Sequence, residues 1–243
     1  MPRPFWIALL AAAAFAVILL SRLPASWIVP RSGTIACTSA DGSLWSGSCS
    51  GLTLERLPFG DLTWDVAPWR LLTGTLAAHV VLAHGPVTGS ADVACGLGGN
   101  VSLQNLIADL QLDPRQIPHL PPQLRGSVHT DLSLVRLAHG RIAELKGRIE
   151  AHDLSQRTGH VTPLGNYALA FPGGGIEPVG TLTDLGGPLA VQGTLRLTDP
   201  PGYVLEGQVA PRADAAPELV STLQFLGSPD AAGRRPFSIA GTF

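Results

Sequence analysis

The sequence predicts a mainly β protein: an extended, curved antiparallel sheet built of successive hairpins, with an N-terminal transmembrane helix and one short helix in the C-terminal region. Three observations predict it. Charged residues are only 14% of the 243 residues, which disfavours long surface helices stabilised by ion pairs. The 28 Gly and 21 Pro interrupt the chain at short intervals. Between them, alternating or β-branched stretches recur, as in antiparallel strands.

The N-terminal helix is predicted from the stretch Phe5 to Leu20, which contains no charged residue. A helix rising about 1.5 Å per residue from Trp6 to Trp27 would extend about 30 Å, the hydrocarbon thickness of a bilayer. Trp6 and Trp27 would then lie at the two membrane interfaces, which tryptophan favours. We therefore expect residues 1–4 to be a cytoplasmic stub, 5–27 a transmembrane signal-anchor and 28–243 a periplasmic β-rich domain.

A cleaved signal peptide is the alternative interpretation of this segment. It is disfavoured because the candidate cleavage site Leu23-Pro24-Ala25 lacks small residues at both recognition positions. The positive-inside rule favours a cytoplasmic N-terminus only weakly, since Arg3 on one side faces Arg22 and Arg31 on the other. The expected location is therefore the inner membrane, single-pass, with most of the chain in the periplasm.

Fourteen strands are expected after the anchor, and turn residues separate them. Their ranges are Gly33–Cys37, Ser43–Cys49, Leu52–Leu57, Asp61–Val66, Gly74–Ala83, Val87–Cys95, Val101–Leu112, Gly126–Leu137, Arg141–His152, Tyr167–Phe171, Val179–Leu185, Leu189–Leu197, Val204–Ala210 and Phe237–Phe243. Turns such as Ala138-His139-Gly140 supply the backbone freedom that hairpins need. The Pro-rich stretch near residues 113 to 125 could separate two halves or be a surface loop, and we favour one continuous sheet.

One helix is expected near the C-terminus. Pro217 suits its first turn, and Gly227 with Pro229 ends it. Its apolar residues recur at helical spacing: Leu219, Val220, Leu223 and Leu226. We expect this apolar stripe to pack on a face of the sheet.

Cys37 and Cys49 flank the turn-like segment Thr38–Ser43, so two strands folded back there could bring the thiols within bridging distance. A disulfide between them would indicate an oxidising compartment, in agreement with export. Buried free thiols are an equally weighted alternative, and the third cysteine, Cys95, leaves the pairing ambiguous.

Trp45, Trp64 and Trp69 fall within one short window of a chain that has few other aromatic residues. They are expected to form a local core cluster, or else a binding face for a partner or an acyl chain.

No enzymatic chemistry is predicted, and we nominate no catalytic, cofactor-binding or metal-binding residue. Gly47-Ser48-Cys49-Ser50-Gly51 resembles a nucleophile elbow, but a strand rather than a helix is expected to follow it. The seven histidines are scattered, without metal-ligand spacing, and are expected to be solvated or to lie at edges. A formal charge of −2 gives no positive field for nucleic acid.

Several short motifs occur in a recognisable order. They are Gly42-Ser43-Leu44-Trp45-Ser46-Gly47, Leu62-Thr63-Trp64-Asp65, Pro68-Trp69-Arg70-Leu71-Leu72, Pro163-Leu164-Gly165-Asn166-Tyr167 and Gly233-Arg234-Arg235-Pro236-Phe237-Ser238. With the N-terminal anchor, this pattern resembles the protein N family of the bacterial type II secretion system over nearly the whole chain. The Gly-x-Leu-Trp-x-Gly and Pro-Trp-x-Leu elements are its most specific parts.

The resemblance implies an accessory inner-membrane component with a periplasmic β-rich domain, which supports transport of folded exoproteins across the outer membrane. It implies other secretion components as partners, on the inner-membrane platform or the outer-membrane secretin side, and no catalytic residues. An anchored periplasmic lipid-binding or lipid-transfer protein is the alternative. A lipid binder should have an open apolar groove, whereas a scaffold should have a filled interior and exposed sheet edges.

Overall fold

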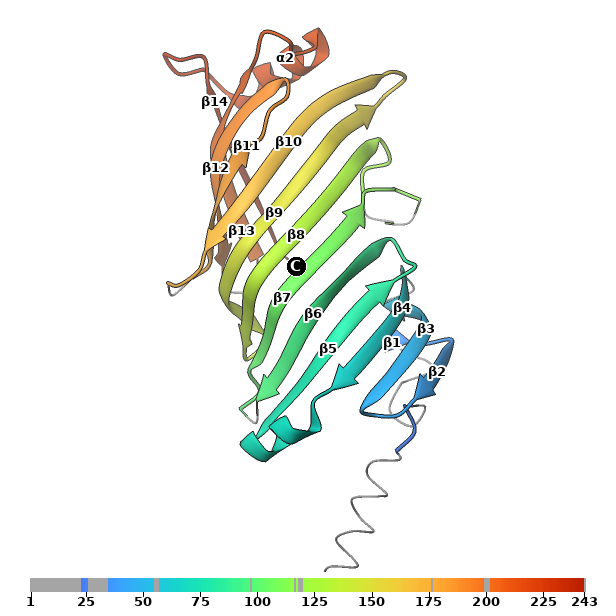
Figure 1. The fold of residues 1–243 in the computed structure, drawn as a ribbon. Helices are drawn as coiled ribbons and strands as arrows, with labels where there is room; N and C mark the ends of the chain where they lie inside the picture. The colour runs from blue at the N-terminus through green and yellow to red at the C-terminus, as the bar shows by residue number, and fades with distance from the viewer. Residues whose placement is uncertain are drawn as a thin grey trace, which may run out of the picture.

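The computed structural model describes residues 23–25, 35–54, 57–96, 98–115, 117, 120–175, 177–198 and 202–242. Within these residues the chain forms one curled, antiparallel sheet of fourteen strands (Figure 1). The strands are β1 (Ile35–Ala36), β2 (Ser39–Gly42), β3 (Ser46–Leu54), β4 (Leu57–Val66), β5 (Thr75–Ala83), β6 (Val87–Gly96), β7 (Val101–Gln111), β8 (Leu124–Ala138), β9 (Arg141–Arg157), β10 (Val161–Pro172), β11 (Val179–Asp184), β12 (Leu189–Thr198), β13 (Gly202–Pro211) and β14 (Arg235–Thr242).

The order of the strands in the sheet follows the order in the sequence. From β3 to β14 each strand pairs with the next one along the chain, and β1 and β2 both pair with β3. Among the described residues, three short helical segments accompany the sheet: η2 (Pro68–Thr73), α2 (Pro217–Leu223) and η3 (Gln224–Leu226). The expectation of a mainly β chain of antiparallel hairpins, with one short helix near the C-terminus, is confirmed.

The Pro-rich stretch is a loop between two paired strands. On either side of it β7 and β8 are hydrogen-bonded along their length, from Val101 opposite Leu137 to Gln111 opposite Ser127. The sheet is therefore continuous across this loop.

The boundaries of the first strands differ from the expectation. Thr38–Ser43, interpreted as a turn, contains β2, and the reversal occurs instead between Gly42 and Ser46. Gly42 has a φ of +91° and Ser43 N–H donates to the Ser46 carbonyl oxygen (2.9 Å). The polar composition of β2 hid it, because Ser, Asp and Gly are typical of turns. The two strands expected at Ser43–Cys49 and Leu52–Leu57 form β3, which runs without interruption from Ser46 to Leu54, and β4 begins at Leu57.

The expected transmembrane segment 5–27, with Trp6 and Trp27, lies outside the described residues except for Leu23–Ala25. In the part of the chain that the structure describes, no helix combines the length and the apolar character needed to cross a membrane.

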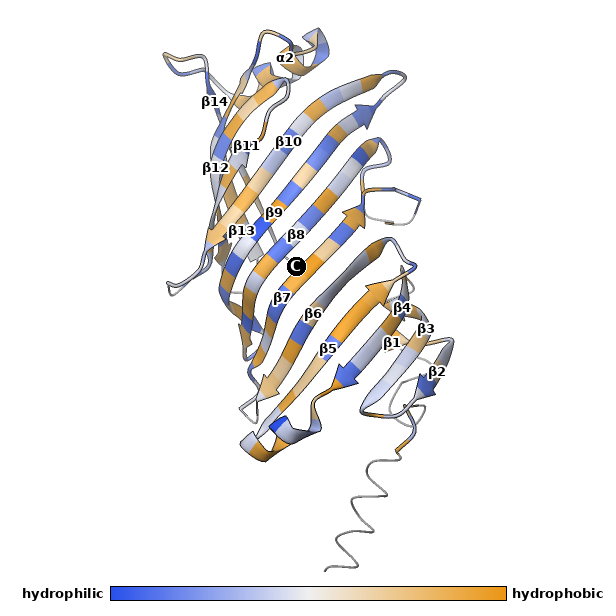
Figure 2. Ribbon diagram, viewed as in Figure 1, coloured by the Kyte–Doolittle hydropathy of each residue, from blue (hydrophilic) through white to orange (hydrophobic). Residues whose placement is uncertain are grey.

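The two faces of the sheet differ in polarity, because successive side chains along a strand point to opposite faces. Figure 2 shows the alternation of hydrophilic and hydrophobic residues along β8 and β9. Cross-strand register identifies one apolar row as Val66, Ala78, Val93, Leu103, Val135 and Leu145. The neighbouring row on the opposite face includes Asp65, His79, Asp92 and Gln104.

The core lies on the apolar face over the middle of the sheet. Its buried members are Leu132 and Val135 of β8, Leu145 of β9 and Phe171 of β10. Half-buried apolar side chains of β7, β9, β10 and β12 pack against them: Leu103, Leu106, Ile142, Ile149, Leu169, Leu195 and Leu197. All these residues come from strands of one sheet, so the core forms within a single layer.

Large side chains fill this single layer by covering glycines of the adjacent strand. Gly147 is opposite both Leu132 and Phe171 in the register. A Cβ on Gly180 would lie 2.7 Å from Phe171 Cε1, so the phenyl ring occupies the space over that glycine. The same arrangement recurs at three cross-strand pairs: Trp64 with Gly47, Phe237 with Gly207 and Tyr203 with Gly241. Aromatic coverage of a strand glycine restores the apolar contact that the missing side chain forfeits.

The C-terminal helix packs less of its surface than expected. Leu223 is buried and Leu219 is half-buried, whereas Val220 and Leu226 are exposed and Phe225 is 90% exposed. The α-helix ends after seven residues and continues as the 3-10 turn η3. Leu226 therefore lies beyond the α-helix, and the four expected positions do not share one buried face.

We predict that Gly180→Ala destabilises the protein by about 1–3 kcal/mol, because the new methyl group overlaps the Phe171 ring. Phe171→Leu in the same background should relieve part of this cost, which a double-mutant cycle measures. The measurement is the denaturation midpoint of the full-length protein in detergent.

The control is Gly98→Ala, where the nearest atom to a new Cβ is Asn100 Nδ2 at 3.8 Å. This change should be neutral or slightly stabilising. Equal midpoints for the Gly180 and Gly98 variants would show that the ring does not restrict position 180.

Candidate functional site

Most of the predicted site residues lie at one corner of the sheet, where the chain enters the fold. We call this the N-terminal corner and define it as Leu23–Ala25, β1 to β4 and η2. In Figure 1 it is the end of the sheet opposite α2.

Cys37 and Cys49 are joined by a disulfide in the structure, with a Cα–Cα distance of 5.7 Å. Cys37 lies between β1 and β2, and Cys49 lies in β3, where its side chain is 1% exposed. The third cysteine, Cys95 of β6, is a half-buried free thiol. The disulfide therefore links β3 to the bend that divides the first edge strand into β1 and β2.

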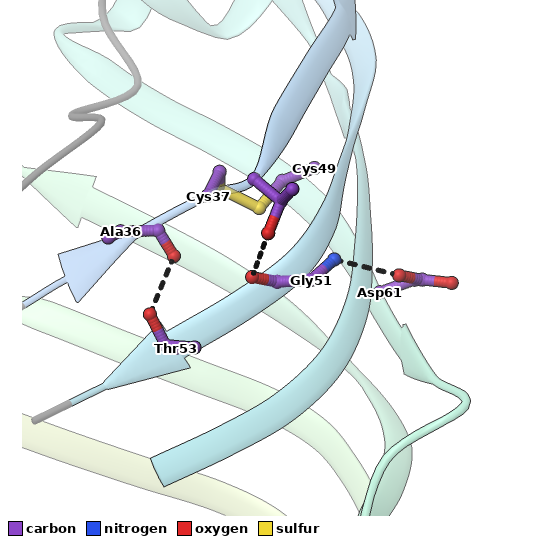
Figure 3. The surroundings of a disulfide bond; sticks show 7 residues. Ala36, Cys37, Cys49, Gly51, Thr53 and Asp61 are labelled. Atoms are coloured by element: carbon purple, nitrogen blue, oxygen red, sulfur yellow. Dashed lines mark hydrogen bonds between the residues drawn. A yellow bond between two sulfur atoms is a disulfide. The ribbon is translucent and has the colours of Figure 1, made fainter. Parts of the chain in front are cut away.

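Side-chain hydrogen bonds reinforce the backbone around this disulfide (Figure 3). Thr53 Oγ1 donates to the Ala36 carbonyl oxygen at 3.2 Å, which holds β1 on β3. Gly51 has a φ of +63° and lies at a break in the β3–β4 register, where its N–H donates to Asp61 Oδ1 at 3.0 Å. An irregularity in the ladder leaves such a donor unpaired, and the Asp61 carboxylate satisfies it.

Two of the three tryptophans belong to adjoining segments of this corner. Trp64 of β4 lies over Gly47, and its Nε1–H donates to the Leu44 carbonyl oxygen at 3.2 Å. Trp45 is half-buried in the turn before β3, and its carbonyl oxygen accepts a bond from Val66 N–H at 2.6 Å. Together these contacts fix the turn between β2 and β3 against the end of β4.

Trp69 lies apart from this packing. It belongs to η2, which connects β4 to β5, and it is 68% exposed. None of the six residues of η2 is buried. The structure thus brings Trp45 and Trp64 into one packed region and places Trp69 on the surface.

The chain that follows the apolar N-terminal segment attaches directly to this corner. Pro24 forms an antiparallel bridge with Ser43, and Leu44 N–H donates to the Leu23 carbonyl oxygen at 3.0 Å. Ala25 is 1% exposed. The point of entry is therefore fixed to the sheet by backbone hydrogen bonding and by burial.

On the polar face, His79 and His129 each pair with a carboxylate on the neighbouring strand. His79 of β5 and Asp92 of β6 are opposite each other, with Nδ1 and Oδ1 2.8 Å apart, and His129 of β8 and Asp109 of β7 are 2.7 Å apart. Sequence reasoning missed both pairs, because residues 13 and 20 positions apart meet only through the hairpin register. The tight turn from His84 to Pro86 could have predicted the register of β5 and β6, and with it the first pair. The long Pro-rich loop between β7 and β8 does not fix their register in the same way, so the second pair could not be predicted.

These contacts shift the pKa of the groups involved. Hydrogen bonds from Asn105 and then from His79 lower the pKa of Asp92. The hydrogen bond to the Asp109 carboxylate raises the pKa of His129 above its ordinary value of 6.5, and the negative charges of Asp131 and Glu150 add to the effect. Each cross-strand pair is an exposed charge-assisted contact that helps to set the register of two strands.

An open groove of about 650 Å³ lies over β11, β12 and β13, mainly against the polar face. Its polar lining includes Thr181, Thr183, Gln192, Arg196 and Glu206. Among the described residues, no group of three or more His, Cys, Asp or Glu side chains is placed to hold a metal ion.

We predict that Cys37→Ser with Cys49→Ser lowers the unfolding free energy by about 3 kcal/mol, because the disulfide closes a short loop in the unfolded chain. Urea denaturation of the full-length protein in detergent measures this. Reductant should lower the wild-type midpoint to that of the double variant. Cys95→Ser is the control and should leave the midpoint unchanged; a double variant as stable as this control would contradict the prediction.

We also predict a pH-dependent contribution from His129. Its pKa is raised in the folded state, so its stabilising contribution is complete below the unfolded value of 6.5 and is lost as pH rises through the folded pKa. Asp109→Asn should lower the pKa of His129, which an NMR titration of the imidazole measures. An unchanged midpoint in that variant would show that Asp109 is not the cause.

Comparison with known proteins agrees with the fold and the motifs. The family model of the type II secretion system (T2SS), protein N, matches residues 34–238. The type II secretion system protein N of Vibrio cholerae serotype O1 is 26% identical over 223 residues, which cover 88% of this chain and 87% of that protein. No solved structure matches the chain. The match confirms the resemblance carried by the Trp45 and Trp69 motifs, and the chain belongs to the type II secretion system protein N family.

Proposed function

We propose that this chain is an accessory inner-membrane component of a type II secretion system, which supports transport of folded exoproteins from the periplasm across the outer membrane. The observation that carries the proposal is the family match across residues 34–238, which spans nearly the entire sheet. A continuous sheet whose β14 edge is unpaired among the described strands suits a structural role in such an assembly.

The compartment is inferred from two features. The Cys37–Cys49 disulfide would persist in an oxidising compartment such as the periplasm. The uncharged stretch from Phe5 to Leu20 has the composition of a membrane anchor. We therefore place the chain in the inner membrane, single-pass, with the sheet in the periplasm.

Partner contacts are proposed at the β14 edge of the sheet. Among the strands that the structure describes, β14 pairs only with β13, so its other edge has backbone groups available for a partner strand. Ile239 of β14 is 50% exposed. The opposite edge is less suitable, because β1 and β2 have two and four residues and are separated by a bend. Components of the inner-membrane platform or of the outer-membrane secretin side are the proposed occupants.

Lipid binding is the second candidate function, and one observation favours it. The core is a single layer, and apolar side chains near its ends stay accessible: Leu76 on β5 is 45% exposed and Ile239 on β14 is 50% exposed. An acyl chain could lie along such a partly open apolar face.

Deletion of the gene distinguishes the two functions. We expect exoproteins to accumulate in the periplasm and to be lost from the culture medium, and the full-length gene should restore their release. Normal release with an altered envelope lipid composition would instead support the lipid-binding function and contradict the secretion role.

The β14 contact is tested in the same strain with a photocrosslinking residue at position 239. We expect crosslinks to other secretion components. The control is the same residue at position 107, because Ile107 is 46% exposed but lies on β7 in the interior of the sheet. Equal crosslinking from the two positions would contradict an edge-specific contact.

A further inference from the structure

The six residues of η2 form an exposed apolar projection at the N-terminal corner. Leu72 is 91% exposed, Trp69 68% and Leu71 45%. Leu76, just beyond it on β5, is also 45% exposed. Large apolar side chains scattered singly on a surface are ordinary, but three of them in one four-residue stretch form a patch that indicates an interaction site.

The projection has a defined conformation. Pro68 occupies its first turn, and Gly74 ends it with a φ of +72°. Gly74 N–H donates to the Leu71 carbonyl oxygen at 3.0 Å, and Thr73 Oγ1 donates to the Arg70 carbonyl oxygen at 2.8 Å. Ala67 N–H donates to the Ala77 carbonyl oxygen at 2.8 Å, which ties the start of the segment to β5. The apolar side chains are therefore held outward by an ordered turn.

The projection lies beside the point where the chain enters the sheet. Pro24 forms a β-bridge with Ser43, directly after β2. The turn that follows is hydrogen-bonded to β3 through Ser43 N–H, which donates to the Ser46 carbonyl oxygen. It is hydrogen-bonded to β4 through the Trp45 carbonyl oxygen, which accepts from Val66 N–H. Only Ala67 separates Val66 from η2. Pro24 and the end of β4 are thus three strand spacings apart, or roughly 15 Å at about 4.8 Å per spacing, and η2 starts two residues beyond Val66.

The chemistry of η2 matches the interface of a bilayer. Tryptophan favours the headgroup region, where its ring is in contact with hydrocarbon and its N–H with water. Leu71 and Leu72 would gain from leaving water. Arg70 is the single charged residue among the six, and its cation suits anionic headgroups. The apolar patch at the opposite end of the sheet, around Phe225, follows the acidic residues Asp214 and Glu218 and lacks this complementarity.

We propose that Pro68–Thr73 is a second membrane contact, which inserts Trp69, Leu71 and Leu72 into the interface of the bilayer that holds the N-terminal segment. This inference rests on the anchor proposed above. Two attachment points close together on one corner would fix the tilt of the sheet, so that the α2 end points away from the membrane and toward partners in the periplasm.

The test uses the full-length protein with Cys95→Ser and Leu72→Cys, labelled with an environment-sensitive fluorophore. The protein is reconstituted in vesicles of phosphatidylethanolamine and phosphatidylglycerol. We expect the label to show a blue-shifted emission, to be quenched by nitroxide lipids labelled near the headgroup and to be protected from aqueous iodide. The matched control is Phe225→Cys, which is equally exposed at the opposite end and should show none of these effects.

A second variant tests the charge. Arg70→Glu in the Leu72→Cys background should reduce quenching by nitroxide lipids in the anionic vesicles and have a smaller effect in vesicles of phosphatidylcholine alone. An equal loss in both compositions would contradict the role assigned to Arg70.

The anchor is assessed separately, by carbonate extraction of the same vesicles. Retained protein whose position 72 is as accessible to iodide as position 225 would overturn the interfacial contact and leave the anchor intact. Protection of position 72 in cells but not in vesicles would indicate a protein partner and would also overturn it. Release of the protein by carbonate would overturn the anchor and this inference together, whereas the secretion assay depends on neither label.

Discussion

The fold depends on large side chains that lie over glycines of the adjacent strand. A sheet usually buries its apolar face against a second layer, but here the buried residues of the core come from neighbouring strands of one sheet. In such a layer a glycine leaves a space that only a neighbouring side chain can fill. The ring of Phe171 fills this space over Gly180, and the ring of Trp64 fills it over Gly47. These strand glycines are therefore part of the packed face of the sheet.

A disulfide and side-chain hydrogen bonds shape the N-terminal corner. The first edge strand is divided by a bend at Cys37, and the disulfide to Cys49 joins that bend to β3. Asp61 satisfies the irregular backbone at Gly51, and Trp64 holds the turn before β3. A short, bent and cross-linked edge is a poor template for strand addition. The opposite edge, β14, is longer and regular, which gives the sheet one protected end and one available end.

The two ends of the sheet therefore differ in what they offer for contact, and this difference bears on the proposed role. One corner receives the chain from its apolar N-terminal segment and carries the exposed turn η2, while the other end carries β14 and the helical segment α2. A component that attaches to a membrane at one corner and offers a free strand at the other could connect a membrane platform to further proteins of the secretion machinery. The polar face between them, with its cross-strand His–Asp pairs, fixes register and contributes little net stability, because exposed ion pairs are screened by water.

Much of this could be predicted from the sequence, because the period of an apolar pattern and the position of turn residues are local properties. The alternation at Leu103 or Val135 indicates a strand, the turn at Gly140 indicates a hairpin, and Cys37 and Cys49 are close enough in sequence to suggest a loop that a disulfide could close. The order of the strands followed from the short connections. Local polarity misled at Thr38–Ser43, where a polar strand has the composition of a turn.

The tertiary structure alone decided which residues meet across strands. The pairing of His129 with Asp109 and the contact of Phe171 with Gly180 depend on the register of long hairpins, and a shift of one residue would exchange the two faces. Exposure was decided in the same way. Trp64 and Trp69 are close in sequence and alike in chemistry, yet one covers a glycine while the other projects into solvent, because β4 ends between them. The sequence by itself determined the strands, and the register of the sheet determined which of their side chains became core and which became surface.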